Sequence, residues 1–116
     1  MADERFLAQL WAVIESRKAD ESATGSYTRK LLSQPSRIRR KIAEEAYEMN
    51  EAHQTLVESK DSPDHLAHEA ADLLYHLFVL LASADVMLSV VYSVLERRYL
   101  APLAGGPAAG SGGKIP

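Results

Sequence analysis

The chain has 116 residues, a formal net charge of −3 and no cysteine. This length suits one domain with a single core, and the lack of cysteine excludes disulfide frameworks, zinc–thiolate sites and cysteine nucleophiles. The negative charge argues against nucleic acid or an anionic membrane as the main partner. No stretch has the pattern of a signal peptide or a membrane span, so we expect a soluble, cytoplasmic protein.

Apolar residues recur with helical periodicity from the beginning of the chain, and no strand pattern is evident. Residues 3–16 are expected to form the first helix. A polar segment follows, and a short helix is predicted over residues 26–32. Pro35 should stop this helix, because a proline disfavours helical geometry in the residue before it.

Two long helices are expected next. The first spans residues 36–59 with Ser36 as its N-cap, and the second spans residues 64–84 with Asp64 as a possible N-cap. The short turn between them returns the chain, so the two helices should lie antiparallel.

The last expected helix begins at Asp85 and covers residues 86–100. Its apolar residues are predicted to face inward: Met87, Val90, Val91, Val94 and Leu95. Residues 101–116 are rich in glycine, proline and alanine and are expected to be disordered. The prediction is therefore an all-α, antiparallel bundle of four to five helices in a domain over residues 1–100, followed by a tail over 101–116.

Four carboxylates stand out as two pairs, Glu45 with Glu48 and Glu69 with Asp72. The i, i+3 spacing puts both members of a pair on one helix face. An antiparallel return of the chain would bring all four together. Because clustered carboxylates repel one another unless a cation intervenes, the sequence predicts a site for Mg²⁺ or Mn²⁺.

The phase of the apolar residues sharpens this prediction. Glu45 falls inside an apolar stripe, where an ionised carboxylate must be paired, protonated or bound to a cation. The stripe residues are Ile38, Ile42, Met49 and Leu56. The bland alternative is that these glutamates belong to a solvated helix face.

The second long helix has its own apolar stripe, bordered by Glu69, Asp72 and His76. The stripe comprises Leu66, Ala70, Leu73, Leu77 and Leu80. Residues 73–81 are apolar nearly all the way round, which a small monomer cannot bury. We therefore expect a homodimer. Trp11 and Tyr47 are expected to be packing residues, and His65 a surface residue.

Basic residues cluster before the first acid pair, at 17–18, 29–30 and 37–41. Cations beside carboxylates suit a small molecule that carries several phosphates, with the carboxylates holding its metal. Solvated surface charge is the alternative for each cluster taken alone.

The acids carry a family resemblance. Glu44-Glu45-x-x-Glu48 followed by Glu69-x-x-Asp72 resembles the EExxE…ExxD signature of the all-α, MazG-like nucleoside triphosphate pyrophosphohydrolases. The stretches Ser-Tyr-Thr-Arg-Lys-Leu-Leu at 26–32 and Ala-Ala-Asp-Leu-Leu-Tyr-His-Leu at 70–77 resemble, more narrowly, the phosphoribosyl-ATP pyrophosphohydrolases of histidine biosynthesis. Ala43 departs from that family, which tends to have glycine there.

The resemblance implies Mg²⁺-dependent hydrolysis of phosphoribosyl-ATP to phosphoribosyl-AMP and pyrophosphate. With that reaction in view, the expected metal ligands are Glu45, Glu48, Glu69 and Asp72. Glu44 is expected to orient or deprotonate the attacking water, and Lys41 to neutralise phosphate charge or pair with a neighbouring glutamate. His76 is expected to hydrogen-bond a ligand rather than bind the metal. The expected phosphate contacts are Arg17, Lys18, Arg29, Lys30 and Arg37.

Two other functions remain open from the residues. A house-cleaning pyrophosphohydrolase for dNTPs or NTPs would need the same acids. A helical dimerisation module without catalytic activity would have an acidic surface of similar composition but no metal.

Overall fold

The computed structural model describes residues 3–20, 22, 25–59 and 62–100, and these residues form helices with no strand. The all-α prediction is confirmed. The chain divides into two compact units, residues 1–85 and 86–116, which are described separately below. The tail expected over 101–116 lies outside the described residues. Among the helices that are described, no single one is both long enough and apolar enough to cross a membrane.

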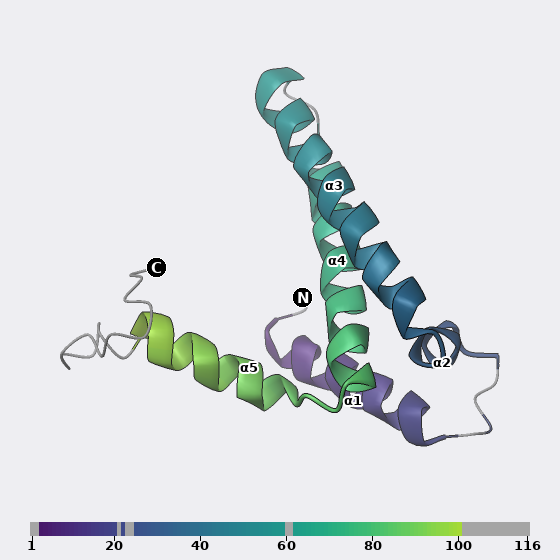
Figure 1. Cartoon of the computed structure of the whole chain (residues 1–116). Coiled ribbons are helices and arrows are strands. Elements are labelled where there is room, and N and C mark those ends of the chain that lie inside the picture. The colour runs from purple at the N-terminus through teal and green to yellow at the C-terminus, as the bar shows by residue number, and fades with distance from the viewer. Residues whose placement is uncertain (1–2, 21, 23–24, 60–61, 101–116) are drawn as a thin grey trace. The chain divides into compact units, whose positions relative to one another are not determined.

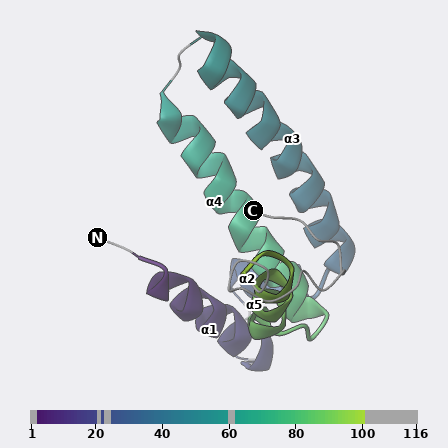
Figure 2. The ribbon, with the colours of Figure 1, turned by 90° about the vertical axis from the view of Figure 1, so that its left-hand side faces the viewer.

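The first unit is built on a helical hairpin. Helix α3, Pro35–Ser59, and helix α4, Pro63–Ser83, run side by side in opposite directions in both views (Figures 1 and 2). Buried residues on the hairpin are Ile38 and Ala52 on α3 and Phe78, Val79 and Ala82 on α4. The antiparallel arrangement predicted from the short turn is confirmed.

Helices α1, Arg5–Ala19, and α2, Tyr27–Leu32, both pack against α4. Figure 1 shows them at the end of the hairpin where α3 begins and α4 ends. Trp11 of α1 meets Phe78 of α4 edge to face, with ring centroids 5.9 Å apart. Trp11 is therefore a packing residue, as predicted, and Leu31 of α2 is fully buried in the same unit.

The first helix runs over Arg5–Ala19 rather than residues 3–16, and the predicted starts of the two long helices are also wrong by one or two residues. Helix α3 begins at Pro35, before the predicted cap Ser36, because proline is tolerated in the first turn, where its missing N–H is not needed. Helix α4 is capped by Ser62 rather than Asp64. The Ser62 hydroxyl accepts a hydrogen bond from the Asp64 amide at 3.2 Å, and Pro63 is the first helical residue.

Several apolar residues are more exposed than predicted. Leu77, placed in the buried stripe of α4, is 39% exposed, and Tyr47, expected to pack, is 65% exposed. The two residues lie on different helices of the hairpin. The described helices of this unit therefore leave parts of both hairpin helices uncovered.

The second unit contains α5, Leu88–Leu95, which continues as a π-helical turn, η1, over Glu96–Leu100. The predicted start at Asp85 is wrong. Asp85 has a φ of 58°, a left-handed conformation that cannot continue a helix, and α5 begins three residues later. Leu88 is buried, but three residues predicted to face inward are exposed: Met87, Val90 and Leu95. A lone described helix has no second helix of its own unit to cover that face.

Candidate active site

The buried centre of the hairpin is a contact between Glu45 of α3 and His76 of α4. Glu45 is only 8% exposed, and its Oε2 lies 2.8 Å from His76 Nδ1. The same nitrogen lies 2.9 Å from the backbone oxygen of Asp72. Because the carbonyl and the ionised carboxylate are both acceptors, Nδ1 must carry a hydrogen to satisfy them. The other ring nitrogen, Nε2, lies 3.2 Å from the hydroxyl of Tyr27 on α2.

Burial raises the pKa of Glu45 above the ordinary carboxyl value. The neighbouring His76 opposes this rise through its charge and its hydrogen bond. The negative charge of Asp72 raises the pKa further, and Lys41 lowers it. The carboxylate is therefore held in a place where its charge is costly and only partly compensated.

A second carboxylate contact joins Glu48 of α3 to Glu69 of α4. The pKa of Glu48 is raised, first because its protonated form can hydrogen-bond Glu69 and second because of the charge on Glu69. Oε1 of Glu69 lies 3.5 Å from Nε2 of His65. Oε2 of Glu69 is buried, and with Glu48 ionised it accepts no hydrogen bond from the described part of the chain. A buried carboxylate oxygen without a donor is a costly arrangement.

The carboxylates thus interact across the hairpin rather than only along each helix. Glu45 interacts with Asp72, and Glu48 with Glu69. All four side chains offer oxygen atoms as metal ligands, which suits a hard cation such as Mg²⁺. Oε2 of Glu69, which accepts no hydrogen bond from the described residues, has lone pairs free to bind such an ion. Within the described ranges, no three Asp, Glu or His side chains are already gathered closely enough to hold a metal ion. The residue types fit the ion, whereas the side chains are not yet arranged as a closed set of ligands.

Two further predicted residues lie on the same turn of α3. Nζ of Lys41 lies 3.7 Å from Oε2 of Glu44, and the two side chains are 36% and 53% exposed. The lysine therefore pairs with Glu44, whereas the partner expected from the sequence was Glu45 or Glu48. A loose, exposed pair of this kind contributes little to stability and leaves both groups available to a ligand.

The basic residues before α3 do not form one cluster. Arg29 directs Nη1 to the backbone oxygens of Arg17 and Lys18, at 3.2 Å and 2.7 Å, and so satisfies carbonyls at the C-terminal end of α1. Lys18 forms an ion pair with Asp85. A pocket of about 240 Å³ is lined by Lys18, Arg29, Leu32 and Ser33.

The remaining predicted phosphate contacts have separate surroundings. The guanidinium carbon of Arg37 lies 6.0 Å from the centroid of the Tyr27 ring, within range of a cation–π interaction. Lys30 is exposed on α2. Nη1 of Arg17 lies 3.3 Å from the hydroxyl of Ser16.

Sequence reasoning assigned no role at the site to Tyr27, Thr28 and Tyr75. The hydroxyls of Thr28 and Tyr75 form a hydrogen bond between α2 and α4. The rings of Tyr27 and Tyr75 stack with centroids 6.3 Å apart. The Ser-Tyr-Thr and Leu-Tyr-His stretches contain these residues and could have pointed to the site, but they were used only for the family resemblance.

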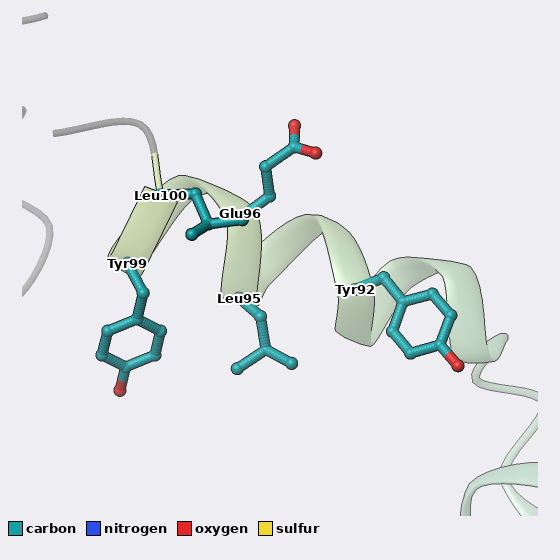
Figure 3. Close-up of a pocket in the computed structure, with 5 residues that line it drawn as sticks. All are labelled: Tyr92, Leu95, Glu96, Tyr99 and Leu100. Carbon is teal, nitrogen blue, oxygen red and sulfur yellow. The ribbon is translucent and has the colours of Figure 1, made fainter. Parts of the chain in front are cut away.

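A separate pocket of about 450 Å³ lies on the second unit and includes no predicted site residue. Figure 3 shows Tyr92, Leu95 and Tyr99 on one side of the ribbon and Glu96 pointing to the other side. Leu100 completes the lining. This pocket is apolar and carries no carboxylate cluster.

Comparison with known proteins adds to this geometry. The model of the phosphoribosyl-ATP pyrophosphohydrolase family matches residues 7–99. A phosphoribosyl-ATP pyrophosphatase of Caulobacter sp. (strain K31) is 44% identical over 92 residues, which cover 79% of this chain and 80% of that protein. One of Jannaschia sp. (strain CCS1) is 44% identical over 80% of this chain and 86% of the relative. The histidine biosynthesis bifunctional protein HisIE of Caldanaerobacter subterraneus is 37% identical over 81% of this chain, which spans only 43% of that longer protein.

Proposed function

The chain belongs to the phosphoribosyl-ATP pyrophosphohydrolase family, and from that premise we propose that it hydrolyses phosphoribosyl-ATP to phosphoribosyl-AMP and pyrophosphate in histidine biosynthesis, with Mg²⁺ as cofactor. The observation that carries the proposal is that carboxylates of α3 and α4 interact across the hairpin, Glu45 with Asp72 and Glu48 with Glu69. Enzymatic hydrolysis of a phosphoanhydride accounts for these costly acids, which a dimerisation module without catalytic activity would not need.

The four carboxylates would hold the cation. When bound, Mg²⁺ would neutralise phosphate charge and make a coordinated water more acidic. Glu45 suits this role because its buried charge is only partly compensated by His76, and the buried Oε2 of Glu69 supports the same assignment. Glu48 and Asp72 are exposed, and they would complete the set of ligands from the solvent side.

Residues beside the ligands would act on the substrate. Glu44 is close to the ligands in sequence and half exposed, so it can accept the proton of the attacking water. Lys41 would leave its loose pair with Glu44 to contact a phosphate oxygen. Further phosphate contacts are proposed for Arg17, Lys18, Arg29, Lys30 and Arg37, of which Lys18 and Arg29 line the pocket of about 240 Å³.

The proposal includes a homodimer in the cytoplasm. Exposed apolar side chains on α4, Leu74 at 43% and Leu77 at 39%, offer a surface that a second copy can cover. The apolar pocket on the second unit, lined by Tyr92 and Leu95, offers another. A chain without cysteine is compatible with the reducing cytoplasm.

The test is pyrophosphate release from phosphoribosyl-ATP by the purified chain, with Mg²⁺ present and then removed by a chelator. We expect turnover that stops on chelation and returns when Mg²⁺ is added back. A panel of dNTPs and NTPs, assayed in parallel, distinguishes a house-cleaning enzyme by its preference for those substrates. Turnover that is unaffected by the chelator would contradict the proposed Mg²⁺ dependence. No turnover of phosphoribosyl-ATP would contradict the proposed substrate.

A further inference from the structure

We infer that Tyr27 is a positioning residue for the metal-binding carboxylate of Glu45 and acts through His76. The inference rests on the proposed function, because it assumes that Glu45 binds the cation. It adds a residue that the acid signature does not contain. Tyr27 lies on α2, outside the helical hairpin that carries all four carboxylates.

The three side chains form a continuous chain of hydrogen bonds across three helices. The Tyr27 hydroxyl lies 3.2 Å from His76 Nε2, and His76 Nδ1 lies 2.8 Å from Glu45 Oε2. His76 is only 6% exposed, so its ring nitrogens have little access to water as substitute partners. Nδ1 carries a hydrogen in either charge state of the ring, whereas Nε2 accepts from the tyrosine hydroxyl in the neutral ring and donates to it in the charged ring.

The tyrosine fixes the orientation of the imidazole ring. The torsion that turns a histidine ring is broad, so one hydrogen bond at Nδ1 restricts the ring only weakly. A hydrogen bond at Nε2 holds the opposite side of the ring and couples to the bond from Nδ1 to Glu45. Removal of the Tyr27 hydroxyl would leave Nε2 buried with no described partner. The ring, and with it the Glu45 carboxylate, would then be held less firmly.

Tyr27 is itself held from several directions, as a positioning residue must be. Its ring stacks on Tyr75 at 6.3 Å with an interplanar angle of 20°, and it lies edge to face with His76. Arg37 lies over the ring, and the Ser26 hydroxyl caps the helix by accepting from the backbone amide of Arg29. These contacts place the hydroxyl without help from a substrate.

This arrangement links the metal ligand to the helix that carries two proposed phosphate contacts. Arg29 and Lys30 follow Tyr27 on α2, so a shift of this short helix would reach Glu45 through His76. For the same reason, loss of the Tyr27 hydroxyl should weaken metal binding even when no nucleotide is bound.

The experiment measures the dissociation constant of Mn²⁺ by electron paramagnetic resonance of the free ion, with no nucleotide present. We compare the wild type with Tyr27→Phe and with Tyr75→Phe. The second variant is a matched control, because it removes a hydroxyl that bonds Thr28 on the same helix and makes no hydrogen bond to His76. Tyr27→Phe should weaken Mn²⁺ binding about 2- to 10-fold, the range for loss of one hydrogen bond, whereas Tyr75→Phe should change it by less than about 2-fold.

A double-mutant cycle tests whether the effect passes through His76. His76→Asn keeps an N–H donor near the position of Nδ1 and has no atom at the position of Nε2. In that background Tyr27→Phe should have no further effect on Mn²⁺ affinity. An equal loss in both backgrounds would overturn the inference, as would a Tyr27→Phe variant that binds Mn²⁺ like the wild type.

The outcomes separate this inference from the proposed function. A wild type that binds Mn²⁺ together with an unaffected Tyr27→Phe variant overturns the positioning role alone. A wild type that binds no Mn²⁺ overturns both. The free energy of unfolding without metal, measured for every variant, shows that a weakened site is not a partly unfolded one.

Discussion

The carboxylate of Glu45 and the imidazole of His76 meet inside the helical hairpin, with 2.8 Å between Oε2 and Nδ1 and both side chains nearly excluded from solvent. This pair decides the electrostatics of the site. Burial disfavours the carboxylate charge, and the hydrogen bond from His76 offsets only part of that cost. The site therefore favours an added positive charge, which is the condition for binding a divalent cation.

Glu45→Gln should lose most of the stabilisation by Mg²⁺. At a Mg²⁺ concentration about 100 times its dissociation constant, the wild type should gain about 2.7 kcal/mol in the free energy of unfolding. The variant lacks the charge of one proposed ligand and should lose most of this gain, together with turnover. Thermal or urea unfolding with and without Mg²⁺ measures the effect.

The matched control for this prediction is Glu51→Gln, an exposed position on the same helix. This variant should keep the full Mg²⁺ stabilisation. Without metal, Glu45→Gln should be at least as stable as the wild type at neutral pH, because a neutral amide replaces a buried charge. Equal Mg²⁺ stabilisation of both variants would remove Glu45 from the metal site.

The stability of the metal-free protein should depend on pH through Glu45 and Glu48. Both have pKa values raised above the ordinary 4.5, so between 4.5 and the raised value the folded state binds more protons than the unfolded state. Stability from these groups is fully present below the ordinary pKa and is lost as the pH rises through the folded-state pKa.

Urea unfolding of the metal-free protein from about pH 4 to about pH 7 measures this pH dependence over the range where raised carboxyl groups titrate. The free energy of unfolding of the wild type relative to Glu45→Gln should fall as the pH rises. Subtracting the free energy of unfolding of Glu45→Gln removes the contribution of the titratable groups that the two proteins share. A relative stability that increases with pH would mean that the Glu45 pKa is lowered in the folded protein.

Alanine substitutions at Arg29 and Lys30 should have different effects on the free energy of unfolding. Arg29→Ala removes the hydrogen bonds to the carbonyls of Arg17 and Lys18, and should cost about 1.5–3 kcal/mol of unfolding free energy, the range for a bond to a charged group. Lys30 is exposed, and Lys30→Ala should change stability by less than about 0.5 kcal/mol.

If both residues contact substrate phosphates, both variants should raise the KM for phosphoribosyl-ATP. Only Arg29→Ala should also lower the melting temperature. A normal melting temperature for that variant would show that its contacts with α1 contribute nothing to stability.

Leu77→Lys should dissociate the proposed homodimer. Leu77 is 39% exposed in the single chain, so a lysine there can reach solvent without disturbing the fold. In a dimer that buries the exposed 39% of Leu77, the loss of apolar burial costs about 0.6–1.2 kcal/mol per subunit, and burial of the lysine charge adds to this cost. Sedimentation velocity should show a dimer for the wild type and a smaller species for the variant.

Gln9→Lys is the control for this substitution, because it adds the same charge at an exposed position on α1. It should remain dimeric. A Leu77→Lys variant with wild-type sedimentation would place the interface elsewhere, and a monomeric wild type would refute the dimer.

The sequence by itself determined the helices, the hairpin and the family. Helical periodicity is a local property, so the long helices followed from spacing, although Pro35 and Ser62 moved their starts by one or two residues. The turn before Pro63 allowed only an antiparallel return. The four carboxylates were visible because their i, i+3 spacing needs no knowledge of packing.

Only the tertiary structure decided which side chains meet. Tyr27, Glu45 and His76 come from three helices, and no repeat within the sequence brings them into one chain of hydrogen bonds. In the same way Arg29 proved to bind the end of α1, because the direction of its side chain depends on how α1 and α2 are packed. Such contacts are set by the relative position of helices, which spacing along one helix does not encode.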